Sequence, residues 1–139
     1  MHYRENDAGW VEFDGELIWD AFAEMIGTLI RQSAVPPESL KHLSLGSQAQ
    51  TFAVVDGAGA LRTPFYSWLD RRAEAEADMV RRELGSCFHA HCSFSPPVAQ
   101  LQLCKMLWLS RHKPAVWEGD AHVVTLPGFL AGRLGGGFV

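Results

Sequence analysis

Apolar residues recur every three or four positions after Asp14, and this spacing predicts the longest helix of the chain. The stripe comprises Leu17, Ile18, Ala21, Phe22, Met25, Ile26, Leu29 and Ile30. Asp14 directly precedes the stripe and is a residue type that caps helix N-termini. Pro36 and Pro37 end any helical continuation. A stripe this wide indicates a helix that packs against a sheet or another helix.

Short apolar runs separated by turn residues predict strands in the middle of the chain. We expect one strand at Leu40–Gly46, with Thr51–Val55 as its partner, and a third at Pro64–Trp68. The glycine-rich segment Asp56–Gly59 has the composition of a turn.

The second half of the chain alternates helical and extended patterns. Asp70 is expected to cap a helix, and Pro127 suits the first helical position of another. The expected segments are a helix at Arg71–Leu84, a loop at Ser86–Pro97, a helix at Val98–His112, a strand at His122–Leu126, a helix at Gly128–Leu134 and the start of a further strand at Gly135–Val139. This order is typical of an α/β fold.

Composition narrows the class of protein. The chain has 139 residues, 47% hydrophobic and 20% charged, which fits one soluble globular domain. A net charge of −4 argues against a nucleic-acid partner, and no apolar run approaches the roughly 20 residues that span a membrane. Three cysteines without a secretion signal favour a reducing compartment, so we expect a cytoplasmic protein.

Small and amide side chains gather just past the first predicted strand, in Ser47-Gln48-Ala49-Gln50-Thr51. Strand ends are where open α/β sheets bind ligands. Neutral amides and hydroxyls suit a polyol, because each hydroxyl of a sugar both donates and accepts a hydrogen bond. The alternative is that these side chains only cap strands and turns.

A second group of candidate binding residues is Trp68, Asp70 and Arg71. An indole can lie on the apolar face of a sugar while a carboxylate or guanidinium binds its hydroxyls. The alternative makes Trp68 a core residue, Asp70 a helix cap and Arg71 a solvent-exposed charge.

Several motifs give the chain a resemblance to a known family. Trp68, Asp70 and Arg72 form a Trp-x-Asp-x-Arg pattern, and Lys105-Met-Leu-Trp-Leu109 is followed by a Lys-Pro stop and by Leu126–Gly135. In this order, over residues 9–139, the chain resembles the N-terminal domain of FGGY-family carbohydrate kinases, the xylulokinase and glycerol kinase group. The resemblance implies part of an actin-like, ribonuclease H-like ATPase domain with a mixed sheet and flanking helices.

The resemblance also implies substrate-binding residues, namely Gln48, Ala49, Gln50, Trp68 and Asp70. At the two positions that touch the substrate, glycerol kinases carry Arg-Glu and xylulokinases Met-His. This chain has Ala49-Gln50, so the sugar is left open. The small Ala49 side chain leaves room for a larger or differently oriented polyol.

Much of the family's catalytic machinery is expected outside these residues. The Asp-x-Gly-Thr/Ser phosphate hairpin, the catalytic Asp and the C-terminal kinase domain have no counterpart here, and both ends look cut. Residues 1–139 are therefore expected to be a partial N-terminal, sugar-binding domain without catalytic or metal-binding residues. ATP and Mg²⁺ would serve the intact enzyme, with neither expected on this segment alone.

Two function hypotheses follow. The first is a fragment of an ATP-dependent carbohydrate kinase, inactive alone, which contributes part of the sugar-binding wall. The second is a non-catalytic carbohydrate- or partner-binding module derived from that fold. An α/β domain without a ligand is a third reading.

The cluster Cys87, His89, His91 and Cys92 offers two thiols and two imidazoles. Its spacing is poor for zinc, because structural sites separate two chelating pairs by a longer loop. We expect a variable loop beside the sugar pocket instead.

Overall fold

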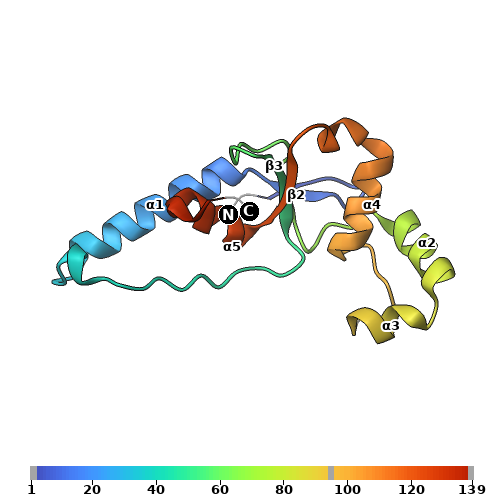
Figure 1. Ribbon diagram of the computed structural model, residues 1–139, viewed down its shortest axis with the longest axis horizontal. Helices are drawn as coiled ribbons and strands as arrows, with labels where there is room; N and C mark the ends of the chain where they lie inside the picture. The colour runs from blue at the N-terminus through green and yellow to red at the C-terminus, as the bar shows by residue number, and fades with distance from the viewer. Residues whose placement is uncertain (1–2, 94–95, 138–139) are drawn as a thin grey trace.

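A five-stranded sheet forms the centre of the computed structural model, which describes residues 3–93 and 96–137 (Figure 1). The order is β1-β2-β4-β3-β5, and every pairing between the described strands is antiparallel, where the sequence predicted a mixed sheet. The strands are β1 (Arg4–Glu5), β2 (Val11–Phe13), β3 (Phe52–Asp56), β4 (Phe65–Tyr66) and β5 (Ala121–Thr125).

Helices cover both faces of this sheet (Figure 1). They are α1 (Gly15–Gln32), α2 (Glu74–Leu84), α3 (Cys87–Cys92), α4 (Gln102–His112) and α5 (Leu126–Ala131). Short 3₁₀ turns lie at Pro37–Ser39 and Pro114–Trp117, and a π-helical turn at Gly132–Gly136 continues α5. The α/β architecture predicted from the sequence is confirmed.

Strand β3 joins the two halves of the hydrophobic core. Its first four residues are fully buried, and alternate side chains point to opposite faces. Phe52 and Val54 pack in the cluster that holds α2 and α4, whereas Ala53 and Val55 pack in the cluster that holds α5 and the first turns of α1. A strand buried on both faces is continuously apolar rather than alternating, as this one is.

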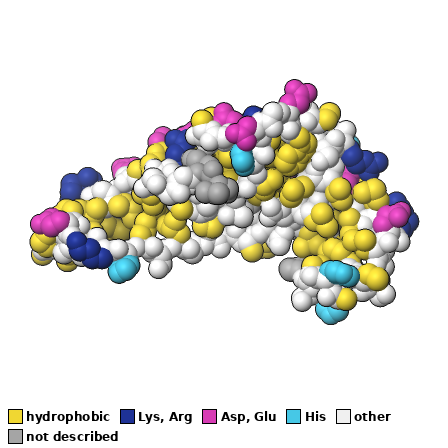
Figure 2. Space-filling view, in the orientation of Figure 1, with side chains coloured by type: hydrophobic (Ala, Val, Ile, Leu, Met, Phe, Trp, Pro, Cys, Tyr) yellow, Lys and Arg dark blue, Asp and Glu magenta, His cyan; other side chains and the backbone are white. Residues whose placement is uncertain are grey.

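Helix α1 begins as predicted, because the Asp14 carboxylate accepts a hydrogen bond from the Glu16 amide at 2.9 Å. Only the N-terminal part of its apolar stripe reaches the core. Ile18 and Phe22 pack against the core there, whereas Leu17 on the neighbouring face, and Met25 and Leu29 farther along, are 62%, 49% and 55% exposed. The far end of α1 extends beyond the sheet in Figure 1, and hydrophobic side chains gather over it in Figure 2.

The predicted strand at Leu40–Gly46 is wrong. The segment is extended but pairs with no described strand, and it runs alongside α1 in Figure 1. Its expected partner β3 has β4 on one edge and β5 on the other. Because both edges of β3 are occupied, no ladder is left for this segment to join.

Two further predictions fail near α2. The helix begins at Glu74 rather than Arg71, and Asp70 does not cap it. The predicted loop at Ser86–Pro97 contains α3, which starts after Gly85 ends α2 with a positive φ of 48° and is anchored by the buried Phe88.

Within the described residues, which end at 137, no new strand begins after Leu134. Gly135 and Gly136 belong to the π-helical turn that follows α5, and Phe138 and Val139 lie outside the described residues.

Candidate functional site

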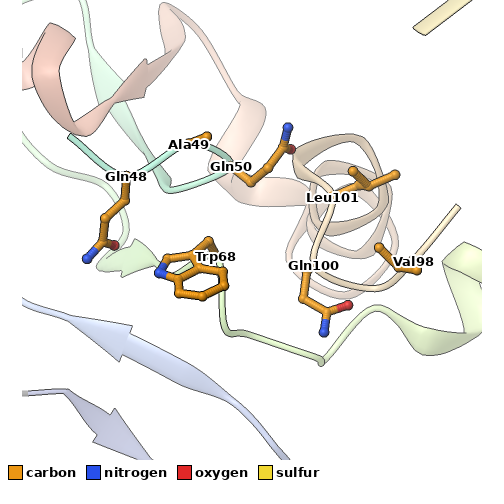
Figure 3. Close-up of a pocket in the computed structure, with 7 residues that line it drawn as sticks. All are labelled: Gln48, Ala49, Gln50, Trp68, Val98, Gln100 and Leu101. Atoms are coloured by element: carbon orange, nitrogen blue, oxygen red, sulfur yellow. The ribbon is translucent and has the colours of Figure 1, made fainter. Parts of the chain in front are cut away.

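A cavity of about 510 Å³ opens between three segments that are distant in the sequence (Figure 3). This volume lies within the usual range for small-molecule sites. The segment before β3, the end of β4 and the approach to α4 contribute the lining residues Gln48, Ala49, Gln50, Trp68, Val98, Gln100 and Leu101. Four of the five predicted substrate-binding residues therefore lie together.

Buried Thr51 connects the first two segments. Its hydroxyl donates to Gln48 Oε1 at 3.1 Å and accepts a hydrogen bond from the Trp68 amide at 3.0 Å. Gln48 Nε2 in turn donates to the Tyr3 hydroxyl at 2.8 Å. These contacts fix the position of Gln48 relative to Trp68.

Gln50 connects the first segment to α4. Its Oε1 accepts a hydrogen bond from the backbone amide of Gln102, the first residue of α4, at 2.6 Å. This contact satisfies one of the amide groups that a helix start leaves unpaired. Gln50 has a left-handed backbone with φ of 58°, a conformation uncommon outside glycine, so tertiary contacts must hold it there.

Trp68 supplies the largest apolar surface of the site. The residue is 48% exposed, and in Figure 3 its indole lies between the side chains of Gln48 and Gln100. The side-chain amide of Gln100 has no hydrogen-bond partner among the described residues. A half-exposed indole beside neutral amides suits a ligand with one apolar face and several hydroxyl groups.

Asp70 does not line the cavity. It is fully buried, and its Oδ2 accepts hydrogen bonds from the Val11 amide at 2.6 Å and from Arg72 Nη2 at 2.8 Å. Arg72 Nε donates to the same carboxylate at 2.9 Å. The predicted contact of Asp70 with substrate therefore has no geometric support, because protein groups occupy its carboxylate.

Arg72 is the centre of a buried charged cluster beneath this part of the fold. Nη2 also binds Glu12 at 3.0 Å, and the guanidinium lies over the rings of Trp10 and Tyr66 at 4.4 Å and of Trp108 at 5.1 Å. Burial acts to lower the pKa of Arg72, but hydrogen bonds and attraction from Asp70 and Glu12 raise it overall. The cluster connects β2, β4 and α4.

The sequence prediction missed Val98, Gln100 and Leu101. They were placed at the start of an apolar helix, where nothing distinguishes pocket residues from core residues. The structure begins α4 at Gln102 and leaves these three in the irregular approach to it, which faces Trp68.

The sequence profile of the FGGY family of carbohydrate kinases, N-terminal domain, matches residues 1–139. This chain belongs to the FGGY family. The family membership predicted from the Trp-x-Asp-x-Arg and Lys-x-x-Trp-Leu motifs is confirmed.

Similar proteins include kinases of both groups. A glycerol kinase from Thermococcus gammatolerans is 30% identical over 98% of this chain and 28% of that protein. A xylulose kinase from Streptomyces rubiginosus is 29% identical over 90% of this chain and 25% of that protein. This FGGY domain thus spans about a quarter of the length of such relatives.

Solved structures show the same fold. A xylulose kinase structure from Brucella ovis superimposes with a TM-score of 0.84 over 95% of this chain and 27% of that one, at 17% identity. A Plasmodium falciparum glycerol kinase with ADP gives a TM-score of 0.79 over 98% of this chain and 28% of that one, at 19% identity.

The cysteine and histidine cluster does not gather into a metal site. Cys87 and Cys92 are exposed at the ends of α3, and His91 Nδ1 lies 2.8 Å from the Cys87 carbonyl. No group of three metal-binding side chains occurs within residues 3–93 and 96–137. In the same ranges, no helix has the length and apolar character needed to cross a bilayer.

Proposed function

We propose that this chain contributes part of the sugar-binding wall of an ATP-dependent carbohydrate kinase, an enzyme that phosphorylates a hydroxyl of a sugar or polyol. The observation that supports it is the cavity in which the half-exposed Trp68 lies among the amide side chains of Gln48, Gln50 and Gln100. Family membership supplies the reaction.

The lining favours an uncharged ligand. None of its seven residues is acidic or basic, and an anionic sugar would lose hydration there without gaining a cationic partner. The side chain of Ala49 leaves room beside Gln50. We therefore expect a ketose or longer polyol to bind better than a sugar acid.

The carboxylates of the described residues are not grouped as a Mg²⁺ site requires. Asp56, in the turn after β3, uses its Oδ1 to accept hydrogen bonds from the Ala58 and Ala60 amides, each at 2.9 Å. No cluster of carboxylates in the described ranges could hold the metal. Phosphoryl transfer requires such groups, so we assign this chain to substrate binding and derive no catalytic step from it.

The rest of the proposed enzyme lies outside these 139 residues. We assign to it the phosphate-binding hairpin, the catalytic base and a C-terminal domain, in keeping with the quarter of each relative that the chain spans. The chain alone is expected to bind sugar without phosphorylating it.

The complete gene product tests this proposal. It is incubated with ATP, Mg²⁺ and either D-xylulose, glycerol or gluconate, and ADP release is measured against a reaction without sugar. We expect sugar-dependent ADP release that is largest with the ketose and smallest with gluconate. Release no greater than the sugar-free background with every sugar or polyol would contradict a kinase.

The alternative is a non-catalytic carbohydrate-binding module. It would use the same cavity and the same lining residues, without a phosphoryl-transfer step. Sugar binding by the chain, combined with a complete gene product that releases no ADP, would support this alternative.

A further inference from the structure

Lys105 is a fully buried lysine that lies beneath the cavity without lining it. Its Nζ donates to the Gln50 carbonyl at 2.8 Å and to the Ser67 carbonyl at 2.7 Å. The same ammonium lies 5.5 Å from the centroid of the Phe52 ring. A lysine buried this completely is rare and requires such partners.

The two carbonyls belong to the two segments that carry the predicted substrate-binding residues. Gln50 ends the segment Gln48–Gln50, and Ser67 directly precedes Trp68. The ammonium therefore joins both segments to α4 at one point. Hydrogen bonds to a charged group are stronger than those between neutral groups.

The backbone of Gln50 explains why such a tie is needed. Its left-handed φ of 58° is unfavourable for a residue with a side chain. Two contacts with α4 oppose that strain, the hydrogen bond from the Gln102 amide to the Gln50 side chain and that from Lys105 to the Gln50 carbonyl.

We propose that Lys105 is a positioning residue of the sugar site: its ammonium holds the Gln48–Gln50 segment and Trp68 in the arrangement that binds the ligand. This inference rests on the proposed function. Lys105 does not line the cavity and acts only through the two segments.

The charge of Lys105 makes the arrangement sensitive to pH. Burial is the largest influence on the pKa of Lys105 and lowers it to about 8. Charge interactions with Asp70 and with Cys104 on the same helix raise this pKa, and repulsion from Arg72 lowers it. Above that pH the amine is neutral and its hydrogen bonds to Gln50 and Ser67 weaken.

Alkaline pH weakens the two hydrogen bonds of Lys105, but it has the opposite effect on the free energy of unfolding. Between a pKa of about 8 in the folded state and the ordinary value of 10.5, the unfolded chain binds more protons than the folded one. Stability contributed by Lys105 therefore rises with pH in this window. The position of the pocket segments and the global stability thus respond differently to alkaline pH.

Carbonyl ¹³C chemical shifts of Gln50 and Ser67, followed from pH 6.5 to 10 without ligand, test the contact itself. We expect both to move with a common midpoint near pH 8. The movement should be absent in Lys105→Met and retained in Lys113→Met, the control at an exposed lysine directly after α4. Shifts that do not titrate in the wild type would overturn the inference, and this arm needs no variant to fold.

Binding of D-xylulose and of glycerol at pH 7 forms the second arm. We expect Lys105→Met to bind the preferred probe at least about tenfold more weakly, because both charged hydrogen bonds to the pocket segments are lost, while Lys113→Met binds as wild type. Wild-type affinity should also fall as pH rises through 8, and Lys105→Met should show no such fall. A folded Lys105→Met with unchanged affinity would overturn the positioning role. If the wild type binds neither probe, the proposed function fails, and the carbonyl titration still decides whether Lys105 holds the two segments.

Discussion

Replacing Arg72 with alanine is expected to lower the free energy of unfolding by about 3–5 kcal/mol. The variant leaves the fully buried Asp70 carboxylate without its bidentate partner and removes the cation from between three aromatic rings. An unpaired buried charge is among the most destabilising changes that one substitution can produce. Urea denaturation monitored by circular dichroism measures the loss.

The neighbouring Arg71 provides a matched control. Its ion pair with Glu74 is exposed on both sides, at 63% and 51%. Exposed pairs of this kind contribute less than about 1 kcal/mol, so Arg71→Ala should remain close to wild type. If the two alanine variants lost equal stability, the buried cluster would not be the point at which β2, β4 and α4 are joined.

Trp68→Ala is expected to weaken sugar binding by about tenfold or more. The substitution removes the apolar surface on which the ring of a sugar would lie, a loss of more than about 1.4 kcal/mol of binding free energy. The Trp68 backbone amide keeps its hydrogen bond to Thr51, so the strand end should stay in place. Isothermal titration calorimetry with D-xylulose measures the change in affinity.

Leu69→Ala is the control for this variant. Leu69 is adjacent, has a similar exposure of 42% and does not line the cavity. It should bind as wild type. Equal weakening by both substitutions would indicate that the strand end, rather than the indole, determines affinity.

Local pattern was enough to predict the elements that are long or continuously apolar. The apolar stripe and Asp14 located α1, the apolar run located β3, and the proline stop located the end of α4. By contrast, β1 and β2 span only two or three residues and exist because they pair with each other and with β4. Such short strands leave no periodic signal.

The failed strand at Leu40–Gly46 has a tertiary cause. Its sequence has strand character, but pairing depends on which edges are free, and both edges of β3 are taken by β4 and β5. Sequence pattern reports the propensity of a segment and not the availability of its partner.

The sequence indicated some of the residues that line the candidate cavity but not their surroundings. Gln48, Ala49, Gln50 and Trp68 belong to motifs that the family resemblance marks, and the fold brings them together. The motif also contains Asp70, which the fold buries against Val11 and Arg72.

The sequence pattern around Lys105 did not indicate that this residue contacts the pocket segments. Within an apolar helical stripe a lysine is usually read as solvent-exposed, and only the folded chain brings the Gln50 and Ser67 carbonyls to its ammonium.

We propose that the cavity between the Gln48–Gln50 segment, Trp68 and the approach to α4 binds an uncharged sugar. A ¹H–¹⁵N NMR titration of this chain with D-xylulose, glycerol and gluconate tests it most directly. We predict saturable shifts of the side-chain amides of Gln48 and Gln100 and of the Trp68 indole with a neutral ligand, and much weaker shifts with gluconate. Shifts confined to other surfaces, such as the apolar residues at the far end of α1, or no saturable shift with any of the three, would show that this cavity is not a sugar site.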